Sequence, residues 1–395
     1  MPRVLSLSTL YPNKAQPRFG TFVARSLEAL QRETEWDVKV INPIGVPPLA
    51  LGQYRARAEA ALDGIERGVP IHRPTFRLLP GVGGRLNPGA IARAVIPLAK
   101  RLHSETPFDL VDAQFFYPDG PAAMRVAKAL GLPLSIKARG ADIHYWGTKP
   151  YARAAMLGAG KAATGMLAVC EALAADMKAL GLPRENIAIH YTGLDRDRFR
   201  PLDHTRLRPR LAQELNLPLA FEEPLLVSVG ALIPRKGQEL VIRALSGLPD
   251  ARLLLVGKGE DEAMLRALAV ELGVAGRVHF LGLLDHDMLP LVLSACDAMV
   301  LPSASEGLAN AWVEALACGT PLVITDVGGA RELVTDPLAG LLVARETQAV
   351  RDGIERVLAE PRDRQAVAAT VERFGWSRNA RALAAHYDRL SGTAG

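Results

Sequence analysis

The chain has 395 residues, of which 49% are hydrophobic and 23% are charged, a composition that can fill a sizeable apolar core. The length exceeds what one hydrophobic core usually serves, so two domains are expected, and the lack of long low-complexity tracts excludes a disordered protein. The formal net charge is +5, with 27 Lys and Arg against 17 Asp and Glu in residues 1–200 and 20 against 25 in residues 201–395.

The N-terminal half begins with MPRVLSLSTLYP, an apolar run that is too short for a signal or membrane-spanning segment and predicts a first core strand. Further short apolar runs predict strands over 4–9, 37–43, 108–114, 132–138, 165–170 and 187–193, with helices over 22–31, 121–130 and 171–180. The segment 71–89 is rich in Pro, Gly and Arg, and we expect a long mobile loop there. Two interpretations of this segment remain. It either contacts a membrane or acceptor, or it is an ordinary surface loop.

Residues 197–224 are rich in proline and of mixed charge, which predicts the hinge between the two domains. We therefore expect one domain over 1–200 and a second over 201–375. The second half contains a cleaner series of apolar runs, which predict strands over 225–230, 251–257, 277–282, 297–303, 320–326 and 339–343. Helical patterns lie between these runs, and this alternation predicts a parallel, doubly wound α/β sheet covered on both faces.

The three cysteines are widely spaced and form no CxxC pair. Cys170, Cys296 and Cys318 each lie among apolar residues. They are therefore expected to be reduced, buried thiols of a cytosolic protein rather than a disulfide framework or a metal site.

In open parallel sheets, ligands bind outside the carboxyl ends of the strands, so candidate residues are sought there. The first strand of the second domain ends at Gly230 and is followed by Arg235 and Lys236, ahead of a helix. A guanidinium and an ammonium near a helix N-terminus form a receptor for a diphosphate. Solvated loop charges are the alternative interpretation.

The segment LPSASEGLANAWVEALACGTPLVIT follows the fourth strand of that domain. Glu306 lies in the loop, and a helix that begins near Leu308 would place Glu314 in its second turn, so that both point into one pocket. Gly307 allows backbone N–H groups to approach a phosphate closely. Glu314 lies among apolar residues, where an unpaired charge is costly, and a carboxylate can accept hydrogen bonds from a ribose diol.

The combination of PRKG, EG and EALACGTPLV resembles the signature of the family-four retaining glycosyltransferases of GT-B fold. The resemblance extends to PRFGTFV, DAQFFYPDG, KARGADIHYW, LAVCEALAADMKALGLP and YTGLDRDRFRP, and it covers nearly the whole chain. By pattern it is closest to enzymes that assemble bacterial surface polysaccharides. The family implies two Rossmann-like, doubly wound domains facing a cleft, with a final helix over 376–392 that crosses back onto the N-terminal domain.

The resemblance also implies residue roles. Arg235 and Lys236 would neutralise the leaving diphosphate, Glu314 would hold the ribose, and Glu306 would bond hydroxyls of the transferred sugar. The other implied donor-binding positions are Gly20 and Thr21 in a glycine loop, Gly230, and the backbone N–H groups of Gly307 and Leu308. Arg139, Asp142 and His144 would lie near the reacting centre or the acceptor.

The chain departs from the family pattern on the acceptor side. It has Asp112-Ala113-Gln114 where relatives often carry HxH, and Arg139-Gly140 where many have His-Gly. Arg139 cannot act as a general base because its charge persists at any working pH. Asp142 is the one candidate for a carboxylate nucleophile in a double displacement. No convincing DxD pair is present, and fixed cations suffice at the phosphates, so neither a metal nor another cofactor is expected.

These observations predict a hexosyltransferase that uses a UDP or GDP sugar and a glycan or lipid-linked acceptor in bacterial surface polysaccharide synthesis. The alternatives are a sugar-nucleotide epimerase on the same fold and a non-catalytic sugar-nucleotide-binding assembly protein. The basic first half indicates an anionic partner, which is either a charged acceptor or the inner-membrane surface to which a cytoplasmic protein attaches peripherally. Ordinary solvated faces of an Arg-rich chain explain the same charge equally well. The basic residues form no stripe of the kind that binds nucleic acid.

Overall fold

The computed structural model describes residues 1–79, 83–218, 222–285 and 287–392. The chain separates into two compact units, and each is described by itself. Unit 1 comprises Met1–Gly193 together with the C-terminal segment that begins at Trp376, and unit 2 comprises Leu194–Gly375. The division therefore falls after Gly193 rather than after Arg200, so residues 194–200 belong to unit 2.

Unit 1 is built on an eight-stranded sheet in which every pairing except one is parallel. The strand order is β10-β9-β8-β7-β1-β2-β5-β4, and β4 pairs antiparallel with β5. Two further short strands, β3 and β6, pair in parallel as a separate two-stranded sheet. In the sequence, β3 follows β2 and β6 follows β5. The strands are β1 (Arg3–Leu7), β2 (Asp37–Ile41), β3 (Ile44–Val46), β4 (Gly64–Glu66), β5 (Val69–His72), β6 (Thr75–Arg77), β7 (Leu110–Ala113), β8 (Leu134–Ala138), β9 (Gly165–Ala168) and β10 (Ile187–Ile189).

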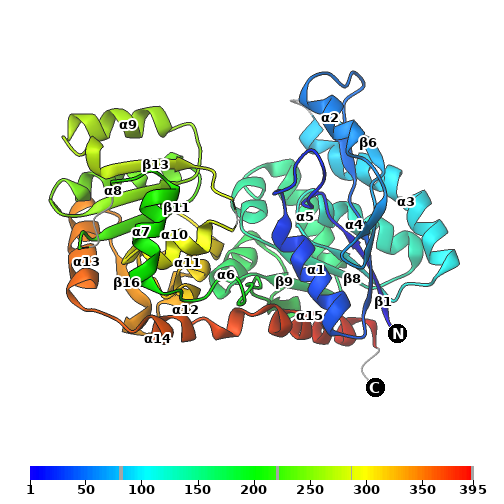
Figure 1. The fold of residues 1–395 in the computed structure, drawn as a ribbon. Helices are drawn as coiled ribbons and strands as arrows, with labels where there is room; N and C mark the ends of the chain where they lie inside the picture. The colour runs from blue at the N-terminus through cyan, green and yellow to red at the C-terminus, as the bar shows by residue number, and fades with distance from the viewer. Residues whose placement is uncertain (80–82, 219–221, 286, 393–395) are drawn as a thin grey trace. The chain divides into compact units, whose positions relative to one another are not determined.

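Helices cover both faces of this sheet. Neighbouring helices α3, α4 and α5 pack together, and α1 packs against the C-terminal helix α15 (Figure 1). The helices of unit 1 are α1 (Thr21–Glu33), α2 (Gln53–Glu59), α3 (Asn87–Glu105), α4 (Asp119–Leu130), α5 (Pro150–Ala162), α6 (Glu171–Leu180) and α15 (Trp376–Ser391), with short turns η1 (Gly83–Arg85), η2 (Asp142–Trp146) and η3 (Arg184–Asn186). The predicted closing helix is confirmed.

Polar contacts fix α15 to unit 1. The Asn379 side chain donates to the Tyr191 carbonyl at 2.6 Å and accepts from the Ser26 hydroxyl at 2.9 Å. The indole of Trp36 donates to Asp388 at 2.9 Å and packs edge-on against Tyr387. Because all these partners of α15 belong to residues 1–193, the last helix is an integral part of the N-terminal unit.

Unit 2 contains a six-stranded, wholly parallel sheet in the order β13-β12-β11-β14-β15-β16. Counted within the unit, this is the 3-2-1-4-5-6 order of the Rossmann fold, whose order reverses between β11 and β14. The strands are β11 (Leu225–Val229), β12 (Arg252–Val256), β13 (Val278–Gly282), β14 (Ala298–Leu301), β15 (Leu322–Thr325) and β16 (Gly340–Val343). All six predicted strands of this half are confirmed.

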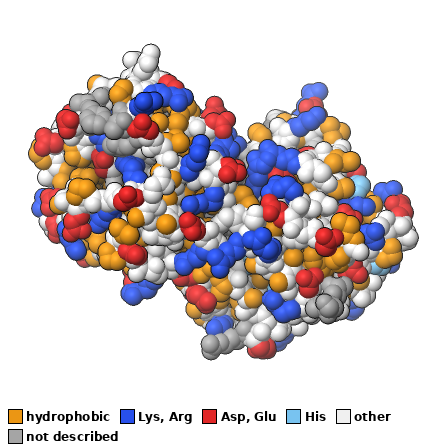
Figure 2. Space-filling model, turned by 60° about the horizontal axis from the view of Figure 1, so that its bottom comes forward, with side chains coloured by type: hydrophobic (Ala, Val, Ile, Leu, Met, Phe, Trp, Pro, Cys, Tyr) orange, Lys and Arg blue, Asp and Glu red, His pale blue; other side chains and the backbone are white. Residues whose placement is uncertain are grey.

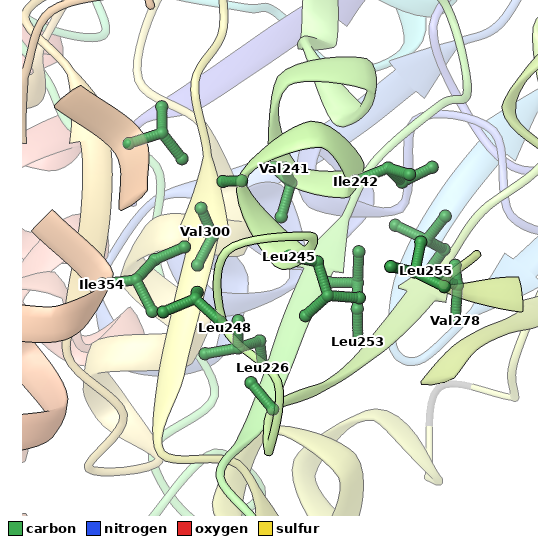
Figure 3. Close-up of a cluster of buried hydrophobic side chains, with 14 of the residues drawn as sticks. Leu226, Val241, Ile242, Leu245, Leu248, Leu253, Leu255, Val278, Val300 and Ile354 are labelled. Atoms are coloured by element: carbon green, nitrogen blue, oxygen red, sulfur yellow. The ribbon is translucent and has the colours of Figure 1, made fainter. Parts of the chain in front are cut away.

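The helices of unit 2 lie on both faces of its sheet. They are α7 (His204–Glu214), α8 (Gln238–Leu245), α9 (Glu262–Glu271), α10 (Leu289–Ala295), α11 (Asn310–Ala317), α12 (Ala330–Leu333), α13 (Thr347–Ala359) and α14 (Arg364–Ala369), with turns η4 (Pro234–Lys236), η5 (Ala275–Arg277), η6 (Pro337–Ala339) and η7 (Glu372–Phe374). One core cluster lies between the sheet and α8, α9 and α13, and its members include Leu226, Val241, Leu245, Leu253 and Ile354 (Figure 3). These side chains are fully buried, and each such burial stabilises the fold by about 1.5–3 kcal/mol.

The sequence predictions for unit 1 hold for its long elements. The six predicted strands and three predicted helices are confirmed, although several ends move by one to four residues. The predicted long loop over 71–89 is wrong for its described part, which contains the end of β5, all of β6 and η1, and the start of α3; residues 80–82 lie outside the described residues. The three cysteines are free and buried, as predicted.

Candidate functional site

The first part of the site is the loop after β11. Pro234–Lys236 form the turn η4, and Gly237 adopts the left-handed conformation with a φ of 76° before α8 begins. A Cβ atom at Gly237 would lie 2.4 Å from the Pro302 carbonyl oxygen, so glycine is required for the close approach of this loop to the one after β14. The backbone N–H of Ala304 also donates to the Arg235 carbonyl at 2.7 Å.

Glu306 joins the two cations of this loop. Its Oε1 lies 2.5 Å from Nζ of Lys236, and its Oε2 lies 3.4 Å from Nη1 of Arg235. Arg235 also donates to the Ser305 carbonyl. The Lys236 and Glu306 side chains are largely buried, whereas Arg235 is exposed over 44% of its side chain. Three residues predicted from separate segments therefore form one cluster with a net charge of +1.

Gly307 and Leu308 offer backbone donors beside this cluster. Within the described part of the chain, neither N–H group has an acceptor, whereas the Gly307 carbonyl accepts from the Gly329 N–H at 2.7 Å. The loop is supported from behind by Gly328, whose φ is +53° and where a Cβ atom would lie 2.3 Å from the carbonyl oxygens of Glu306 and Gly307. Two fixed, unpaired N–H groups next to two cations can bind an anion.

Glu314 lies on α11, the helix that follows this loop. The helix begins at Asn310 rather than near Leu308, so Glu314 lies in its second turn as predicted. Burial raises the pKa of its carboxyl group to about 7, and the nearby charge of Arg198 opposes this rise. Within the described residues, no side chain or backbone group donates a hydrogen bond to this carboxylate, so it can accept hydrogen bonds from a ligand.

Gly230 lies at the end of β11, below the Lys236 side chain. A Cβ atom at this position would lie 3.5 Å from Cε of Lys236, which is ordinary van der Waals contact. Its N–H donates to the Val256 carbonyl at 2.9 Å. The backbone of Gly230 therefore packs against the aliphatic part of the Lys236 side chain. The predicted residues in the loops after β11 and β14 thus lie where the strand order reverses, whereas Glu314 lies further along, on α11.

In unit 1, Gly20 and Thr21 lie where the chain enters α1. Gly20 has a φ of 72°, and a Cβ atom there would lie 2.4 Å from the Leu10 carbonyl oxygen, so this position requires glycine. Thr21 is the first residue of the helix and is exposed. The turn after β1 and the start of α1 are therefore in direct backbone contact.

Arg139 and Asp142 are bound within unit 1. Arg139 donates from Nε and Nη2 to the carbonyl and side-chain oxygens of Gln114 at 2.7 and 2.6 Å, and burial lowers its pKa to about 10. Asp142 is fully buried and accepts from the backbone N–H groups of Phe116, Arg139, Gly140 and Ile143. These contacts make Asp142 an anchor for the loop after β8, and they leave no free oxygen for the nucleophilic role considered from the sequence.

His144 lies further along the same loop and is partly exposed. Its Nε2 is 2.8 Å from Oδ2 of Asp176, which lies on α6. A carboxylate partner orients the imidazole ring. His144 is therefore the most accessible of the three residues predicted for the acceptor side.

Residues 213–373 match the family of glycosyl transferases group 1, and residues 19–198 match glycosyltransferase family 4. The two matches occur in the order that the sequence signature implies, and together they extend over most of both units. The chain belongs to the family-four glycosyltransferases. Its structure is accordingly of the GT-B type, with one Rossmann-like sheet in each unit.

This glycosyltransferase is similar along its whole length to TuaC of Bacillus subtilis, a protein named for teichuronic acid biosynthesis, with 29% identity over 99% of both chains. It is 35% identical to the D-inositol 3-phosphate glycosyltransferase of Mycobacterium tuberculosis over 54% of this chain and 45% of that one. Among solved structures, HepE of Anabaena in complex with UDP and glucose aligns with a TM-score of 0.74 at 21% identity over 99% of this chain and all of that one. Sucrose-phosphate synthase of Thermosynechococcus elongatus aligns over both full chains with a TM-score of 0.78 at 20% identity.

The sequence did not indicate two arginines that contact or act on the candidate site. Arg345, which follows β16, donates to the Pro302 carbonyl at 3.1 Å and to the Pro234 carbonyl at 2.9 Å, so it holds both site loops together. Arg198 is the charge that acts on Glu314. The only sequence signal for the role of Arg345 is its position just after a strand, because its partners are backbone atoms far away in the sequence.

Among the described residues, no cluster of three His, Cys, Asp or Glu side chains is arranged to hold a metal ion. No helix in the described ranges is both long and apolar enough to cross a membrane.

Proposed function

We propose that this glycosyltransferase transfers a hexose from a UDP or GDP sugar to a glycan or lipid-linked acceptor in bacterial surface polysaccharide synthesis. The cluster of Arg235, Lys236 and Glu306 at the carboxyl ends of β11 and β14 carries the proposal. The names of relatives are consistent with it, since TuaC is named for teichuronic acid biosynthesis and HepE was solved with UDP and glucose.

The donor's diphosphate would bind at the two cations. Departure of a nucleoside diphosphate builds negative charge on the phosphates, and fixed positive groups stabilise that charge in the transition state. Lys236 and Arg235 supply two charges, and the free N–H groups of Gly307 and Leu308 supply two further donors. This set of donors supports reaction without a metal ion or another cofactor.

The two glutamates would hold the sugars of the donor. Glu314 would accept hydrogen bonds from the ribose diol, and Glu306 would bond hydroxyl groups of the transferred hexose. Glu306 already keeps both cations together through its two oxygens, so it also fixes the place at which the phosphates bind.

We infer a retaining reaction on one face of the hexose. The bond from C1 to the phosphate oxygen breaks, its electron pair stays on the phosphate, and the acceptor oxygen bonds C1 from the same face. The departing phosphate oxygen takes the acceptor's proton. A double displacement would need a free carboxylate near C1, and the engagement of all sides of Asp142 by backbone N–H groups speaks against this residue.

Cytoplasmic location with peripheral membrane attachment is the part of the proposal that rests on charge alone. Residues 1–200 carry an excess of ten basic residues over acidic ones, being 27 minus 17. On the face shown in Figure 2, Lys and Arg side chains are interspersed with acidic and apolar ones. An electrostatic attachment of this kind weakens as salt screens the charges, so high salt should release the protein from anionic vesicles.

Thermal unfolding with UDP, GDP, ADP and CMP, each with EDTA, tests the donor site. We expect one nucleoside diphosphate to raise Tm without metal, because a ligand at 100 times its Kd stabilises the fold by about 2.7 kcal/mol. The Glu314→Ala variant should lose this stabilisation. If no nucleotide raises Tm, or if a shift requires divalent metal, the proposed metal-free donor site is wrong.

A further inference from the structure

A pocket of about 360 Å³ lies within unit 1 at the carboxyl edge of its large sheet. Its volume falls in the range of small-molecule sites, which is about 300–1,000 Å³. Segments that follow β1, β2 and β7 form its base, and the pair β3 and β6 and helix α2 form its walls. The lining residues are Thr9, Asn13, Gln16, Phe19, Pro43, Ile44, Gly45, Arg57, Phe76, Leu78, Asn87 and Pro118.

The lining combines neutral hydrogen-bonding groups with apolar surface. Asn13, Gln16 and Asn87 contribute amides, and Phe19 and Phe76 contribute aromatic rings. The Thr9 hydroxyl donates to Asp119 at 2.7 Å, so its oxygen remains able to accept from a ligand hydroxyl. Amides and hydroxyls beside aromatic faces suit a sugar, which presents hydroxyl groups around its rim and C–H groups on its faces.

Among the described residues that line the pocket, Arg57 is the single charged one, and none carries a carboxylate. In the described part of the chain, its guanidinium contacts no carboxylate or carbonyl oxygen, and it lies 5.4 Å from the centre of the Tyr54 ring. The neighbouring Arg55 differs, since it pairs with Glu59 at 3.1 Å on the exposed side of α2. Arg57 is therefore a half-buried cation whose five donors remain available.

Helix α3 adds to the positive potential of the pocket. This 19-residue helix begins at Asn87, which lines the pocket, and its first turn contains no acidic residue. The N-terminus of a helix carries a partial positive charge, which favours an anion nearby. A neutral ligand would leave both Arg57 and this helix end without a counter-charge.

We propose that this pocket binds an acidic sugar group of the acceptor, with Arg57 forming a two-pronged contact to its carboxylate or phosphate. A guanidinium matches either group through two parallel N–H donors. The inference rests on the proposed glycosyl transfer, because it assigns the acceptor's chemical class. Arg57 is a specificity-determining residue here, and the amides and aromatic rings bind the uncharged part of the sugar.

Matched pairs of small acceptor analogues test this proposal by ligand-detected NMR titration at pH 7 in low salt. One arm compares 4-nitrophenyl β-glucuronide with 4-nitrophenyl β-glucoside, and the other compares glucose 1-phosphate with methyl α-glucoside. We expect the acidic member of at least one pair to bind tenfold or more tightly than its neutral partner. The arm that shows the preference identifies the acidic group as carboxylate or phosphate.

Three variants locate the preference at Arg57. Arg57→Gln should abolish it, Arg57→Lys should retain part of it because the charge remains, and the control Arg55→Gln should leave it unchanged. Stabilisation by a nucleoside diphosphate, measured on the same samples, reports folding and the donor site separately. Equal binding of acidic and neutral sugars, or a preference that survives Arg57→Gln, overturns this inference even when nucleotide binding is intact. Failure of nucleotides to bind the wild-type protein instead overturns the proposed function.

Discussion

Replacement of Lys236 by Met is expected to lower kcat about 10²–10³-fold, the usual effect of removing one group that stabilises developing charge. The ammonium group lies 2.5 Å from Glu306 and is largely buried, so water cannot replace it easily. KM for the donor should change less than kcat, because the charge on the phosphates is greatest in the transition state. Steady-state transfer to an acceptor, measured over a range of donor concentrations, gives both constants.

Two further variants show whether a loss of kcat comes from the missing positive charge at residue 236 or from a loss of folding. Lys258→Met removes an exposed lysine that follows the neighbouring strand β12, and it should leave kcat unchanged. Lys236→Arg keeps the positive charge and should retain more activity than Lys236→Met at a similar Tm. Equal kcat values for Lys236→Met and wild type would remove Lys236 from the proposed chemistry.

The Glu314→Gln variant is expected to bind the donor nucleotide at least tenfold more weakly while gaining stability at pH 8. Burial raises the pKa of Glu314 to about 7 in the folded protein, above its ordinary value of 4.5 in the unfolded chain. The folded state therefore holds a proton that the unfolded state releases between these values. Its stability falls as pH rises from about 4.5 to 7, and the amide variant avoids that loss.

The same carboxyl group should give nucleotide binding a pH dependence. A ribose diol donates to the carboxylate form, so binding at pH 6 should release a proton from Glu314 and weaken as pH falls below about 7. Calorimetry in two buffers of different ionisation enthalpy counts the released protons, and Glu314→Gln supplies the baseline for titration of the phosphates themselves. If wild type and variant release the same number of protons and unfold at the same Tm at pH 8, Glu314 does not hold the ribose.

The sheet of unit 2 could be predicted because its strands are buried on both faces and appear as continuous apolar runs, such as Leu225–Val229 and Ala298–Leu301. The cluster of Arg235, Lys236 and Glu306 could be predicted for a related reason. Charged residues that follow neighbouring parallel strands meet at the same edge of a sheet. The order of the motifs in unit 2 was thus enough to predict that these charged residues lie together.

Other features depend on contacts that no local pattern encodes. The strand Thr75–Arg77 is three residues long and pairs with Ile44–Val46 across a wide sequence separation, so the segment 71–89 resembled a loop. Asp142 follows a strand and has the chemistry of a reactive carboxylate, yet backbone N–H groups of its own loop and of Phe116 satisfy it. Arg57 lines a pocket only because that short strand pair and α2 fold back over the ends of the main sheet.

A comparison of nucleoside diphosphate and monophosphate binding to wild type and to Lys236→Met, by calorimetry in EDTA, tests the central claim most directly. The base should be the one that raises Tm, so that the two ligands differ by one phosphate alone. If Lys236 neutralises the leaving diphosphate, wild type should bind the diphosphate at least 30-fold more tightly, a preference of about 2 kcal/mol. Lys236→Met should lose most of this preference and bind the monophosphate almost as wild type does. An undiminished preference in Lys236→Met would contradict the placement of the diphosphate at this cluster.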